Sequence, residues 1–475
     1  MVGGGAAGLH VALEAAAAGA SVALVSRKPL TESASFWAQG GLAAAIAPDD
    51  SPARHAEDTI NAGRALCDPG AVEALVDDAA AAVAKLTRLG VEFDRDPEGG
   101  FALALEGGHS TRRIVHAGGA ATGQAITRCL AERTAAEQRI TALEGASVLA
   151  LWSDGKRCFG VITDRGPLRT AATVMATGGG AALWSRTTNP WGAVAAGSVL
   201  AQQAGAELAG LELCQFHPTA LFAPGSRFDG RLITEAVRGE GAVLVDAAGR
   251  RFTDELAPRD QVTDAILDRM AADQLGSVGL DLRPVALERF PSIGSMLLEA
   301  GIDPEHAPVP VAPAAHYLIG GIRTDLQGRT AVAGLLAVGE CAYTGLHGAN
   351  RLASNSLSEC FVFGSHAAGA AAELAATGVL EAEAPALPAW RFVPPRPATR
   401  ERLWALAGPQ RSASDLERLG EDPYPLARMI GASALLRAES RGAHRRIDFP
   451  GRDGGLDATH TVIGRDGVAR LQRWL

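Results

Sequence analysis

The stretch Gly3-Gly4-Gly5-Ala6-Ala7-Gly8 decides the fold class of this chain. Glycines in the spacing G-x-G-x-x-G permit a tight turn, and they let a pyrophosphate approach the unpaired N–H groups at the start of a helix. The alanine-rich run that follows extends to about Ala18, with Gly19 as its C-cap, and residues 21–25 have the pattern of a buried strand. These residues predict an α/β, Rossmann-like unit that binds a dinucleotide.

Two features of this unit depart from the usual pattern. Only Met1 and Val2 precede the glycines, whereas such a unit normally opens with a strand of about five or six residues. We expect the first strand to be nearly missing, as a start site placed too far downstream would leave it. The acidic residue that follows the second strand of an NAD site is absent, because Ser26-Arg27-Lys28 stands there. A plain NAD site is therefore disfavoured.

The composition excludes several classes of partner. The chain has 475 residues, 47% of them apolar, which is enough for about three domains and a large core. A formal net charge of −9 without long runs of like charge argues against nucleic acid and anionic membrane surfaces. The sequence contains no run of about 20 apolar residues without glycine or polar breaks, so it predicts no membrane-spanning helix. The six cysteines form neither a C-x-x-C pair nor a metal-ligand cluster, so we expect a cytoplasmic protein without a metal site.

The rest of the sequence indicates a core sheet that a long insertion interrupts. Two helices and three strands of a small sheet are predicted at residues 71–89, 122–134, 148–151, 159–162 and 168–176. A further strand at 335–338 ends in Gly339-Glu340 and resumes the core sheet. Between about 211 and 317, mixed loops, short helices and prolines indicate an inserted domain. A proline-rich linker at 385–397 leads into a helical, arginine-rich tail.

The segment Ser33-Ala34-Ser35-Phe36-Trp37-Ala38-Gln39-Gly40-Gly41-Leu42 suits backbone contact with a flat cofactor ring, with an ordinary surface loop as the alternative. At this point the chain resembles the superfamily of FAD proteins that contains succinate dehydrogenase, fumarate reductase and L-aspartate oxidase. The succinate dehydrogenase branch carries a histidine that bonds covalently to the flavin, where this chain has Ala34. The resemblance therefore implies a non-covalent FAD.

Three more segments extend the resemblance. Ala176-Thr177-Gly178-Gly179 resembles the second flavin signature, and Gly339-Glu340 resembles the third, whose acid meets ribitol or ribose hydroxyls. Residues 348–357 resemble the segment whose Ser356 and Leu357 cover the pyrimidine edge of the flavin. The resemblance implies the following cofactor residues: Gly3, Gly4, Gly5, Ala6, Ala7, Gly8, Arg27, Ala34, Ser35, Phe36, Trp37, Ala38, Gln39, Gly40, Gly41, Thr177, Gly178, Glu340, Asn355, Ser356 and Leu357.

The resemblance also implies a division into domains. A discontinuous FAD-binding domain would comprise residues 1–210 and 318–387, with an α+β capping domain at 211–317 and a short C-terminal helical domain at 388–475. One departure concerns the cofactor. The superfamily usually has Gly-Asp-Gly, with the acid near the flavin, where this chain has Ala195-Ala196-Gly197. Weak FAD retention or an inactive relative therefore stay open as alternatives.

A site for a four-carbon dicarboxylate must desolvate two negative charges, so it needs at least two buried cations or several strong donors. The chain resembles the superfamily's dicarboxylate site, which implies that His217, His316 and Arg351 grip the carboxylates. Arg259 would carry a proton, although an arginine with a pKa above about 12 is a poor base, so in amino-acid oxidation it would act mainly through its charge. The residues that would line the site are Gln215, Thr219, Thr234 and Glu235. Taken singly, each histidine would more often be a satisfied polar residue in a core or interface, and Arg259 would more often be a surface salt-bridge partner.

One segment separates the branches of the superfamily. Residues 105–117, with Glu106 near their start, resemble the aspartate oxidase version, in which the glutamate orients the substrate's ammonium. A carboxylate that faces a bound cation suits aspartate and would repel succinate or fumarate. The alternative is that Glu106 only caps a turn or pairs with Arg112 or Arg113. Residues 439–450 resemble the C-terminal signature and would close one side of the site.

As a whole, the resemblance implies FAD-dependent oxidation of L-aspartate to iminoaspartate, with O2 as the acceptor that gives H2O2, or with fumarate instead. The imine would feed quinolinate formation in NAD biosynthesis, which makes quinolinate synthase the neighbour in the pathway. Two alternatives stay open. One is a soluble fumarate reductase or succinate dehydrogenase-type flavoprotein, and the other is a catalytically impaired flavin-binding relative or a flavin-free scaffold.

Overall fold

A parallel sheet centred on Val2 forms the middle of the structure, a computed structural model that describes residues 1–377 and 383–474. Val2 occupies the position of a strand between β1 (Val22–Ser26) and β9 (Thr173–Met175). It bridges Val25 on one side and Met175 on the other, both in parallel orientation. The strands around it are, in spatial order, β5 (Ile140–Glu144), β1, β9 and β16 (Leu335–Ala337). Two residues thus occupy the central position of a Rossmann-like sheet.

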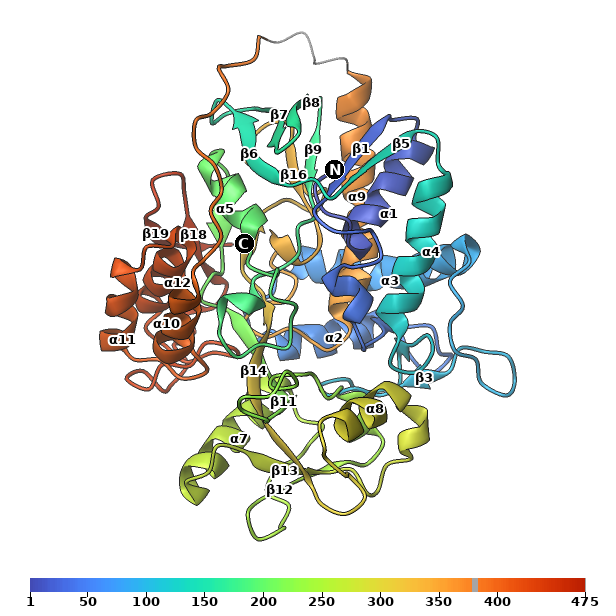
Figure 1. Cartoon of the computed structure of the whole chain (residues 1–475), viewed down its shortest axis with the longest axis vertical. Helices are drawn as coiled ribbons and strands as arrows, with labels where there is room; N and C mark the ends of the chain where they lie inside the picture. Colours follow the sequence, from blue (N-terminus) through green and yellow to red (C-terminus); the bar gives the residue numbers. More distant parts are fainter. Residues whose placement is uncertain (378–382, 475) are drawn as a thin grey trace.

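Helices pack beside this sheet and against one another (Figure 1): α1 (Ala6–Ala17), α3 (Pro69–Leu89), α4 (Thr122–Ala136) and α9 (Asn355–Ala376). α1 contacts both α4 and α9, and this approach is close because α1 consists largely of alanine. Leu9, Leu24 and Phe361 are fully buried between these elements. The two helices predicted from periodicity are confirmed, with ends that differ by at most two residues.

Smaller elements complete the region around these helices: α2 (Pro52–Ala62), α5 (Ala196–Gln203), and a sheet of β2 (Leu42–Ala43), β4 (Ile114–Val115) and β3 (Leu103–Ala104). A separate antiparallel sheet consists of β6 (Val148–Ser153), β7 (Cys158–Thr163) and β8 (Gly166–Arg169). The prediction of one strand at 168–176 in that sheet was wrong, because the run breaks after Arg169 and β9 joins the central sheet instead. Strand pairing depends on partners that are distant in the sequence, so the pattern of a single run cannot reveal the change of sheet.

A second antiparallel sheet extends away from the central one at the bottom of Figure 1. Its strands, in spatial order, are β11 (Cys214–Leu221), β14 (Val309–Leu318), β13 (Val278–Asp281) and β12 (Val243–Val245). Three helices accompany it: α6 (Ala236–Gly239), α7 (Arg259–Asp273) and α8 (Pro291–Glu299). β11 and β14 are long and completely or almost completely buried, and they run from the central region into this sheet. The division into domains that the sequence suggested stays a prediction.

The C-terminal region contains the expected helices, α10 (Pro397–Ala407), α11 (Ala413–Arg418) and α12 (Pro425–Leu436). It also contains two strands that the sequence analysis missed, β18 (Thr459–Ile463) and β19 (Ala469–Arg473). They extend a sheet whose other strands are β17 (Ala342–Tyr343), β15 (Gly321–Arg323) and β10 (Leu208–Ala209). The tail is therefore joined by backbone hydrogen bonds to the region that carries the central sheet.

Four buried histidines make this fold sensitive to acid. Burial lowers the pKa of His10 and of His55 to about 4. It lowers the pKa of His109 and of His460 to about 3. In the unfolded chain these side chains titrate near pH ~6.5, so below that pH the unfolded state binds protons that the native state does not bind.

We predict that the free energy of unfolding falls as the pH drops from about 6.5 towards 4. Each histidine would remove roughly 1.4 kcal/mol per pH unit in that window. Burial raises the pKa of Glu340 to about 8 and that of Asp264 to about 6, which opposes the loss, but the histidines are more numerous. The melting temperature, followed by circular dichroism, should decrease across this interval. A constant melting temperature would contradict the neutral state of the four rings.

Candidate active site

The turn between the first strand and α1 is so tight that only glycine fits. Gly3 has a φ of +111°, and a Cβ there would lie 2.2 Å from the carbonyl oxygen of Ala176. A Cβ at Gly8 would lie 1.9 Å from the carbonyl oxygen of Gly3. α1 has no side-chain cap at its glycine N-cap, and Ser35 Oγ accepts a hydrogen bond from the N–H of Ala6 at 3.1 Å. A helix start of this kind favours a pyrophosphate.

Three buried side-chain oxygens near this turn have no hydrogen-bond partner in the described part of the chain: Ser33 Oγ, Gln39 Oε1 and Thr177 Oγ1. Ser33 and Gln39 belong to the segment at 33–42 that the sequence associated with a flat ring, and Thr177 to the second flavin signature. Buried polar atoms are nearly always paired, and an unpaired one costs about 1–3 kcal/mol. The residues present therefore fit FAD, whose hydroxyls, carbonyls and ring nitrogens can pair with them.

Glu340 lies against the second flavin signature. A Cβ at Gly179 would be 1.8 Å from Glu340 Oε1, and the same oxygen accepts the N–H of Leu318 at 3.2 Å. Burial raises the pKa of Glu340 to about 8, so the carboxyl group is largely protonated at neutral pH and can both donate to and accept from a hydroxyl. Ser356 and Leu357 lie in the first turn of α9, whose N–H groups have no partner within the helix.

Other predicted cofactor residues have different surroundings. Asn355 uses its side chain within the protein, with Oδ1 2.8 Å from His55 Nε2 and Nδ2 3.0 Å from Thr59 Oγ1. This side chain supports the start of α9 from within the protein. Arg27 is exposed and donates to a backbone carbonyl at 3.3 Å. Trp37 lies on a 3-10 turn with 61% of its surface exposed.

The residues from Gly3 to Gly8, together with the second and third flavin signatures, form the cradle that would hold FAD. The start of α5 lies beside this cradle and departs from the superfamily pattern. Ala195 precedes the helix in the left-handed region, at a φ of +48°, and no side chain caps it. Ala196 follows as the first helical residue, where the superfamily pattern has an acid. A Cβ at Gly197 would lie 2.0 Å from Thr177 Oγ1, so the start of α5 faces the second flavin signature with a methyl group in place of a carboxylate.

Two guanidinium groups are buried on either side of one amide. Arg259 begins α7 and is 7% exposed, and Arg351 lies in the loop before α9 and is 4% exposed. Gln215 Oε1 accepts from Arg259 Nη1 at 3.0 Å and from Arg351 Nε at 3.4 Å. Its Nε2 donates to Asn350 Oδ1 and to the carbonyl of Arg351, each at 2.8 Å, which fixes the orientation of the amide. Burial lowers the pKa of Arg351 to about 10, so the group stays charged at neutral pH.

Glu235 and Arg238 continue the array of charges beyond Arg259. Glu235 Oε2 accepts from Arg259 Nε at 2.7 Å, and Glu235 Oε1 lies 3.1 Å from Arg238 Nη2. Burial by itself would raise the pKa of Glu235, but Arg259 and Arg238 hold it below its usual value. Arg238 also donates to the carbonyl of Glu255. In the series Arg238–Glu235–Arg259, a bound anion would contact the guanidinium of Arg259.

Two histidine rings lie edge to face beside the arginines. The ring centroids of His217 and His316 are 5.1 Å apart. The N–H of Thr219 donates to His217 Nδ1 at 3.2 Å, which places the proton of the neutral ring on Nε2. His316 Nδ1 lies 2.8 Å from Thr188 Oγ1, and its Nε2 lies 3.4 Å from Arg351 Nη2. Burial, followed by the neighbouring guanidinium charges, lowers the pKa of both rings well below its usual value, so they act as neutral hydrogen-bonding groups.

The two predicted threonines differ in their availability. Thr219 donates its hydroxyl to the carbonyl of Ile233 at 3.0 Å and so supports His217. Thr234 is buried, and among the described residues its hydroxyl has no hydrogen-bond partner. The described part of the chain has no group of three or more His, Cys, Asp or Glu side chains that could hold a metal ion.

Glu106 reaches the same site from the segment at 105–117 and is 2% exposed. Its Oε2 accepts from Ser354 Oγ at 2.6 Å. Its Oε1 accepts no hydrogen bond from the described residues and lies 3.6 Å from His116 Nε2. The charge of Glu106 raises the pKa of both Arg238 and Arg351, against the larger effect of burial, which places the carboxylate within electrostatic reach of the arginines.

The interpretation of Glu106 as a partner of a neighbouring arginine is contradicted. Arg113 is fully buried and bonds to Asp50 and Asp58 at 2.6–3.0 Å. Arg112 is exposed and forms no ion pair within the described residues. Glu106 is thus a buried carboxylate with one uncommitted oxygen in a site dominated by arginines, which suits a cationic group on the ligand.

A buried cluster lies beneath Arg351. The Arg351 Cζ atom is 4.9 Å from the centroid of the Tyr317 ring, and the Tyr317 hydroxyl donates to Glu359 Oε2 at 3.0 Å. His347 Nε2 lies 3.1 Å from the same oxygen. These side chains connect β14, the loop before Arg351 and α9. Those three segments carry His316, Arg351 and the helix start assigned to the flavin.

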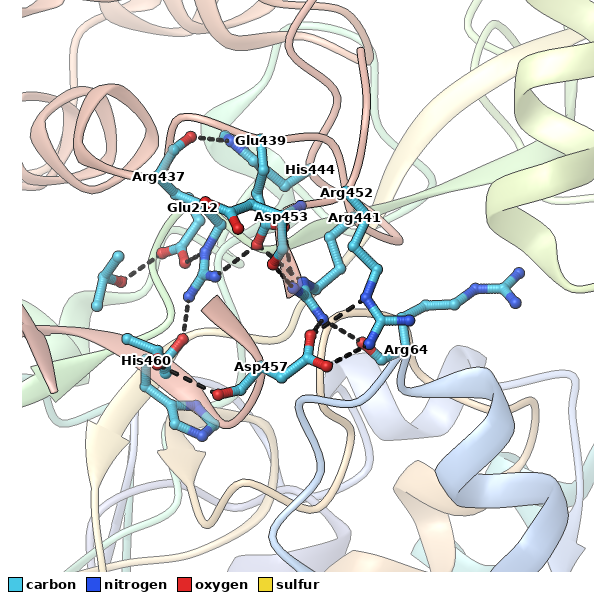
Figure 2. A network of polar contacts seen from close by, with 12 residues as sticks. Arg64, Glu212, Arg437, Glu439, Arg441, His444, Arg452, Asp453, Asp457 and His460 are labelled. Atoms are coloured by element: carbon cyan, nitrogen blue, oxygen red, sulfur yellow. Dashed lines mark hydrogen bonds and ion pairs between the residues drawn. The ribbon is translucent and has the colours of Figure 1, made fainter. Parts of the chain in front are cut away.

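The C-terminal region supports the site through a buried ionic network (Figure 2). Arg437 and Arg441 share Glu439, at 2.9 and 2.8 Å. Arg437 also pairs with Glu212 at 2.7 Å, and Arg441 pairs with Asp457 at 2.8 Å. Removing one partner from a buried pair costs about 3–5 kcal/mol, so this network holds its segments in one arrangement.

Two contacts transmit this arrangement to the site. Arg441 donates to the carbonyl of Arg64 at 2.7 Å (Figure 2), and the Arg64 side chain makes two hydrogen bonds, of 2.9 and 3.0 Å, to Asp260. Asp260 directly follows Arg259 at the start of α7. A Cβ at Gly442 would lie 2.5 Å from the carbonyl oxygen of Ala349, two residues before Arg351. The predicted role of the 439–450 segment beside the site is consistent with these contacts.

Sequence reasoning missed the residues that orient the predicted ones. Ser354 and Asn350 could have been found, because both lie within the segment at 348–357. No local signal pointed to the others, since their partners are far away in the sequence. These residues are Thr188, His347 and Glu359.

Comparison with known protein families gives two matches. Residues 1–357 match the FAD binding domain, and residues 420–472 match the fumarate reductase flavoprotein C-terminal family. The L-aspartate oxidase of Streptomyces coelicolor is 41% identical over 98% of this chain and 90% of that protein. The L-aspartate oxidase of Caulobacter vibrioides is 42% identical over 98% and 96%. The L-aspartate oxidase of Nostoc sp. is 46% identical over 82% and 70%.

Solved structures with the same fold come from related flavoproteins. The chain superposes on E. coli quinol fumarate reductase FrdA with a TM-score of 0.88 and 29% identity, over 99% of this chain and 95% of that one. For Mycobacterium smegmatis Sdh1 the TM-score is 0.82 at 29% identity, over 100% and 94%. Within residues 1–377 and 383–474, no helix combines the length and apolar character needed to cross a membrane.

We predict that two substitutions at Tyr317 separate support from binding. Tyr317→Phe keeps a ring beneath Arg351 but removes a donor from Glu359, so it should lower stability by about 1–3 kcal/mol and leave dicarboxylate affinity nearly unchanged. Tyr317→Leu also removes the cation–π contact, worth about 0.5–2 kcal/mol, so succinate should bind several-fold more weakly. Thermal unfolding and a titration with succinate measure the two effects. Equal affinities in the two variants would contradict the role of the ring.

Proposed function

Since the chain belongs to the L-aspartate oxidase family of FAD-binding flavoproteins, we propose that it oxidises L-aspartate to iminoaspartate. One observation carries the proposal further than family membership. Glu106 is buried beside the arginines and keeps one oxygen uncommitted. L-Aspartate has two carboxylates and one ammonium, which match two guanidiniums and one carboxylate. Succinate and fumarate have nothing that could neutralise Glu106.

The residues of the site would hold the substrate in a fixed orientation. His217, His316 and Arg351 would bind its carboxylates, and Gln215 sets the spacing between the two guanidiniums through a shared oxygen. Buried charges interact strongly because little water screens them. When bound, FAD supplies the acceptor for the hydride that leaves C2 of aspartate. The residues that would hold it are those of the cradle from Gly3 to Gly8 and the second and third flavin signatures.

Arg259 would act mainly through its charge. Glu235 and Gln215 hold its Nε and Nη1, and its Nη2 has no hydrogen-bond partner among the described residues. The remaining N–H groups would therefore face the ligand. In amino-acid oxidation the proton that leaves is on nitrogen, so an arginine need not accept one, and a fixed positive charge near a carboxylate is what the geometry supports.

We further propose the electron acceptors and the place of the reaction in metabolism. Molecular oxygen would reoxidise the cofactor and give H2O2, and fumarate would be an alternative acceptor. The imine product would feed quinolinate formation, so quinolinate synthase would be the neighbouring enzyme, in the cytoplasm. The binding of FAD would be non-covalent, because Ala34 offers no group for a bond to the ring.

The test is the visible spectrum of the purified protein under anaerobic conditions. A flavin band that L-aspartate bleaches, and that succinate does not, supports the proposal. Bleaching by succinate alone would assign the protein to the fumarate reductases and succinate dehydrogenases. Absence of a flavin band, even after FAD is supplied, would favour a scaffold that has lost its chemistry. Admission of air, with measurement of H2O2, then tests the acceptor.

Glu106→Gln should separate two substrates. The variant removes the charge that faces the ammonium but keeps the size of the side chain and an oxygen for Ser354. We expect the KM for L-aspartate to rise by about 10-fold or more, since a hydrogen bond to a charged group contributes about 1.5–3 kcal/mol. Fumarate has no ammonium, so its reduction should be spared. Steady-state kinetics with both substrates measures this, and an equal loss of both activities would refute the ammonium role.

A further inference from the structure

His116 is buried next to Glu106, and no described residue forms a hydrogen bond with its ring. The residue is 7% exposed, and neither its Nδ1 nor its Nε2 is paired. A neutral imidazole has one donor and one acceptor, and each buried, unpaired polar group costs about 1–3 kcal/mol. The nearest ionised oxygen is Glu106 Oε1, 3.6 Å from Nε2. An imidazole held in this way beside the ammonium subsite needs a function that offsets its cost.

The contacts of Glu106 assign different tasks to its two oxygens. Ser354 Oγ donates to Oε2 at 2.6 Å and holds the carboxylate in place. The same hydroxyl accepts the N–H of Gly41 at 3.2 Å. Oε1 is the oxygen left for a ligand, and it is also the one nearest to His116. A bound ammonium and the His116 ring therefore meet at the same atom.

The charged and titratable groups around Glu106 and His116 come from several segments of the chain. Within 4 Å of the His116 ring, Glu106 is the only carboxylate that the described residues provide. Across the site, the charge of Glu106 raises the pKa of both Arg238 and Arg351, against the larger effect of burial. His109, on the same segment, is no competitor, because burial lowers its pKa to about 3.

On the adjoining turn, Asp94 is held by hydrogen bonds to the backbone. Its N–H donates to the carbonyl of His116 at 2.8 Å, and its carboxylate accepts the N–H groups of Gly118 and Gly119 at 2.8 and 2.9 Å. The side chain of Asp94 is thus committed to the backbone. The ring of His116 faces Glu106 without another acid in contact.

The chemistry of amine oxidation requires a proton acceptor at this place. L-Aspartate carries an ammonium, which has no lone pair, whereas a C=N bond forms from the lone pair of the nitrogen. One N–H proton must therefore leave before C2 is oxidised. Arg259 is a poor candidate, since a guanidinium is already protonated. Histidine is the side chain whose ordinary pKa is suited to this task near neutral pH.

We propose that Glu106 and His116 together accept the ammonium proton of the substrate. The N–H bond of the ammonium breaks, the proton passes by way of Glu106 Oε1 to His116 Nε2, and a new N–H bond forms on the imidazole. Glu106 remains a carboxylate, and the amine nitrogen keeps the electron pair that the imine requires. The imidazolium then forms an ion pair with Glu106. This inference rests on the proposed function.

The experiment uses the FAD-loaded enzyme and the variants His116→Gln and His116→Phe. Glutamine can donate a hydrogen bond to Glu106 but cannot take up a proton. FAD content and succinate affinity, both measured by the flavin spectrum, should match the unchanged protein and show that the fold and the dicarboxylate site are intact. The rate of anaerobic flavin reduction by L-aspartate near neutral pH should fall by about 100-fold or more in both variants. The deficit should shrink as the pH rises, because more of the substrate then arrives as free amine.

Fumarate reduction serves as the internal control, since fumarate has no amine, and it should be unchanged in both variants. His10→Gln is the matched control for loss of a buried histidine. His10 bonds to Ser365 at 2.9 Å, outside the site, and its replacement should leave the aspartate rate unchanged.

A normal aspartate rate in His116→Gln would overturn the proposal. An equal loss of aspartate oxidation and fumarate reduction, or a loss that does not change with pH, would also overturn it, because either result indicates a structural role. If the Gln variant fails to hold FAD, the Phe variant, whose ring fills the same space, decides by the same criteria. Failure of the proposed function is distinguishable, because the unchanged protein would then not be reduced by L-aspartate at all.

Discussion

Two positive charges share one neutral acceptor at the centre of this protein. Arg259 and Arg351 both donate to Gln215 Oε1, and both are almost completely buried. Like charges in a region that excludes water repel each other strongly, so the arrangement persists only because its surroundings hold it. Glu235 neutralises one side of it. A dicarboxylate ligand would neutralise the other side.

Three separate segments of the fold carry Gln215, Arg259 and Arg351. β11, α7 and the loop before α9 each contribute one of them, and no two of these segments are adjacent in the sequence. Tyr317 and Glu359 secure the loop from below. The network around Glu439 (Figure 2) includes Arg441, which bonds to the carbonyl of Arg64, and the Arg64 side chain in turn bonds to Asp260 in α7. The buried ion pairs outside the site thus help to fix the segments that carry the charged residues of the site.

Charge also explains why the neighbouring histidines are neutral and why Glu106 matters. Burial and the guanidiniums lower the pKa of His217 and His316 well below its usual value, so the rings can hydrogen-bond a carboxylate without adding to the repulsion. Glu106 is the carboxylate in this environment that retains an open oxygen. A ligand with an ammonium can pair with it, and the same oxygen leads to the unpaired ring of His116. Substrate choice and proton acceptance would therefore depend on one carboxylate.

The sequence by itself determined the parts that act locally. The glycines from Gly3 to Gly8 predicted the turn and helix, because backbone conformation depends on neighbouring residues, and the order of the flavin segments predicted the family. The sequence could not show that residues 168–176 divide between two sheets, or that β18 pairs with β10, since pairing depends on distant partners. Nor could it show that Arg113 belongs to Asp50 and Asp58, which leaves Glu106 free. Only the tertiary structure decided these points, because burial and charge pairing are properties of the residues that folding brings together.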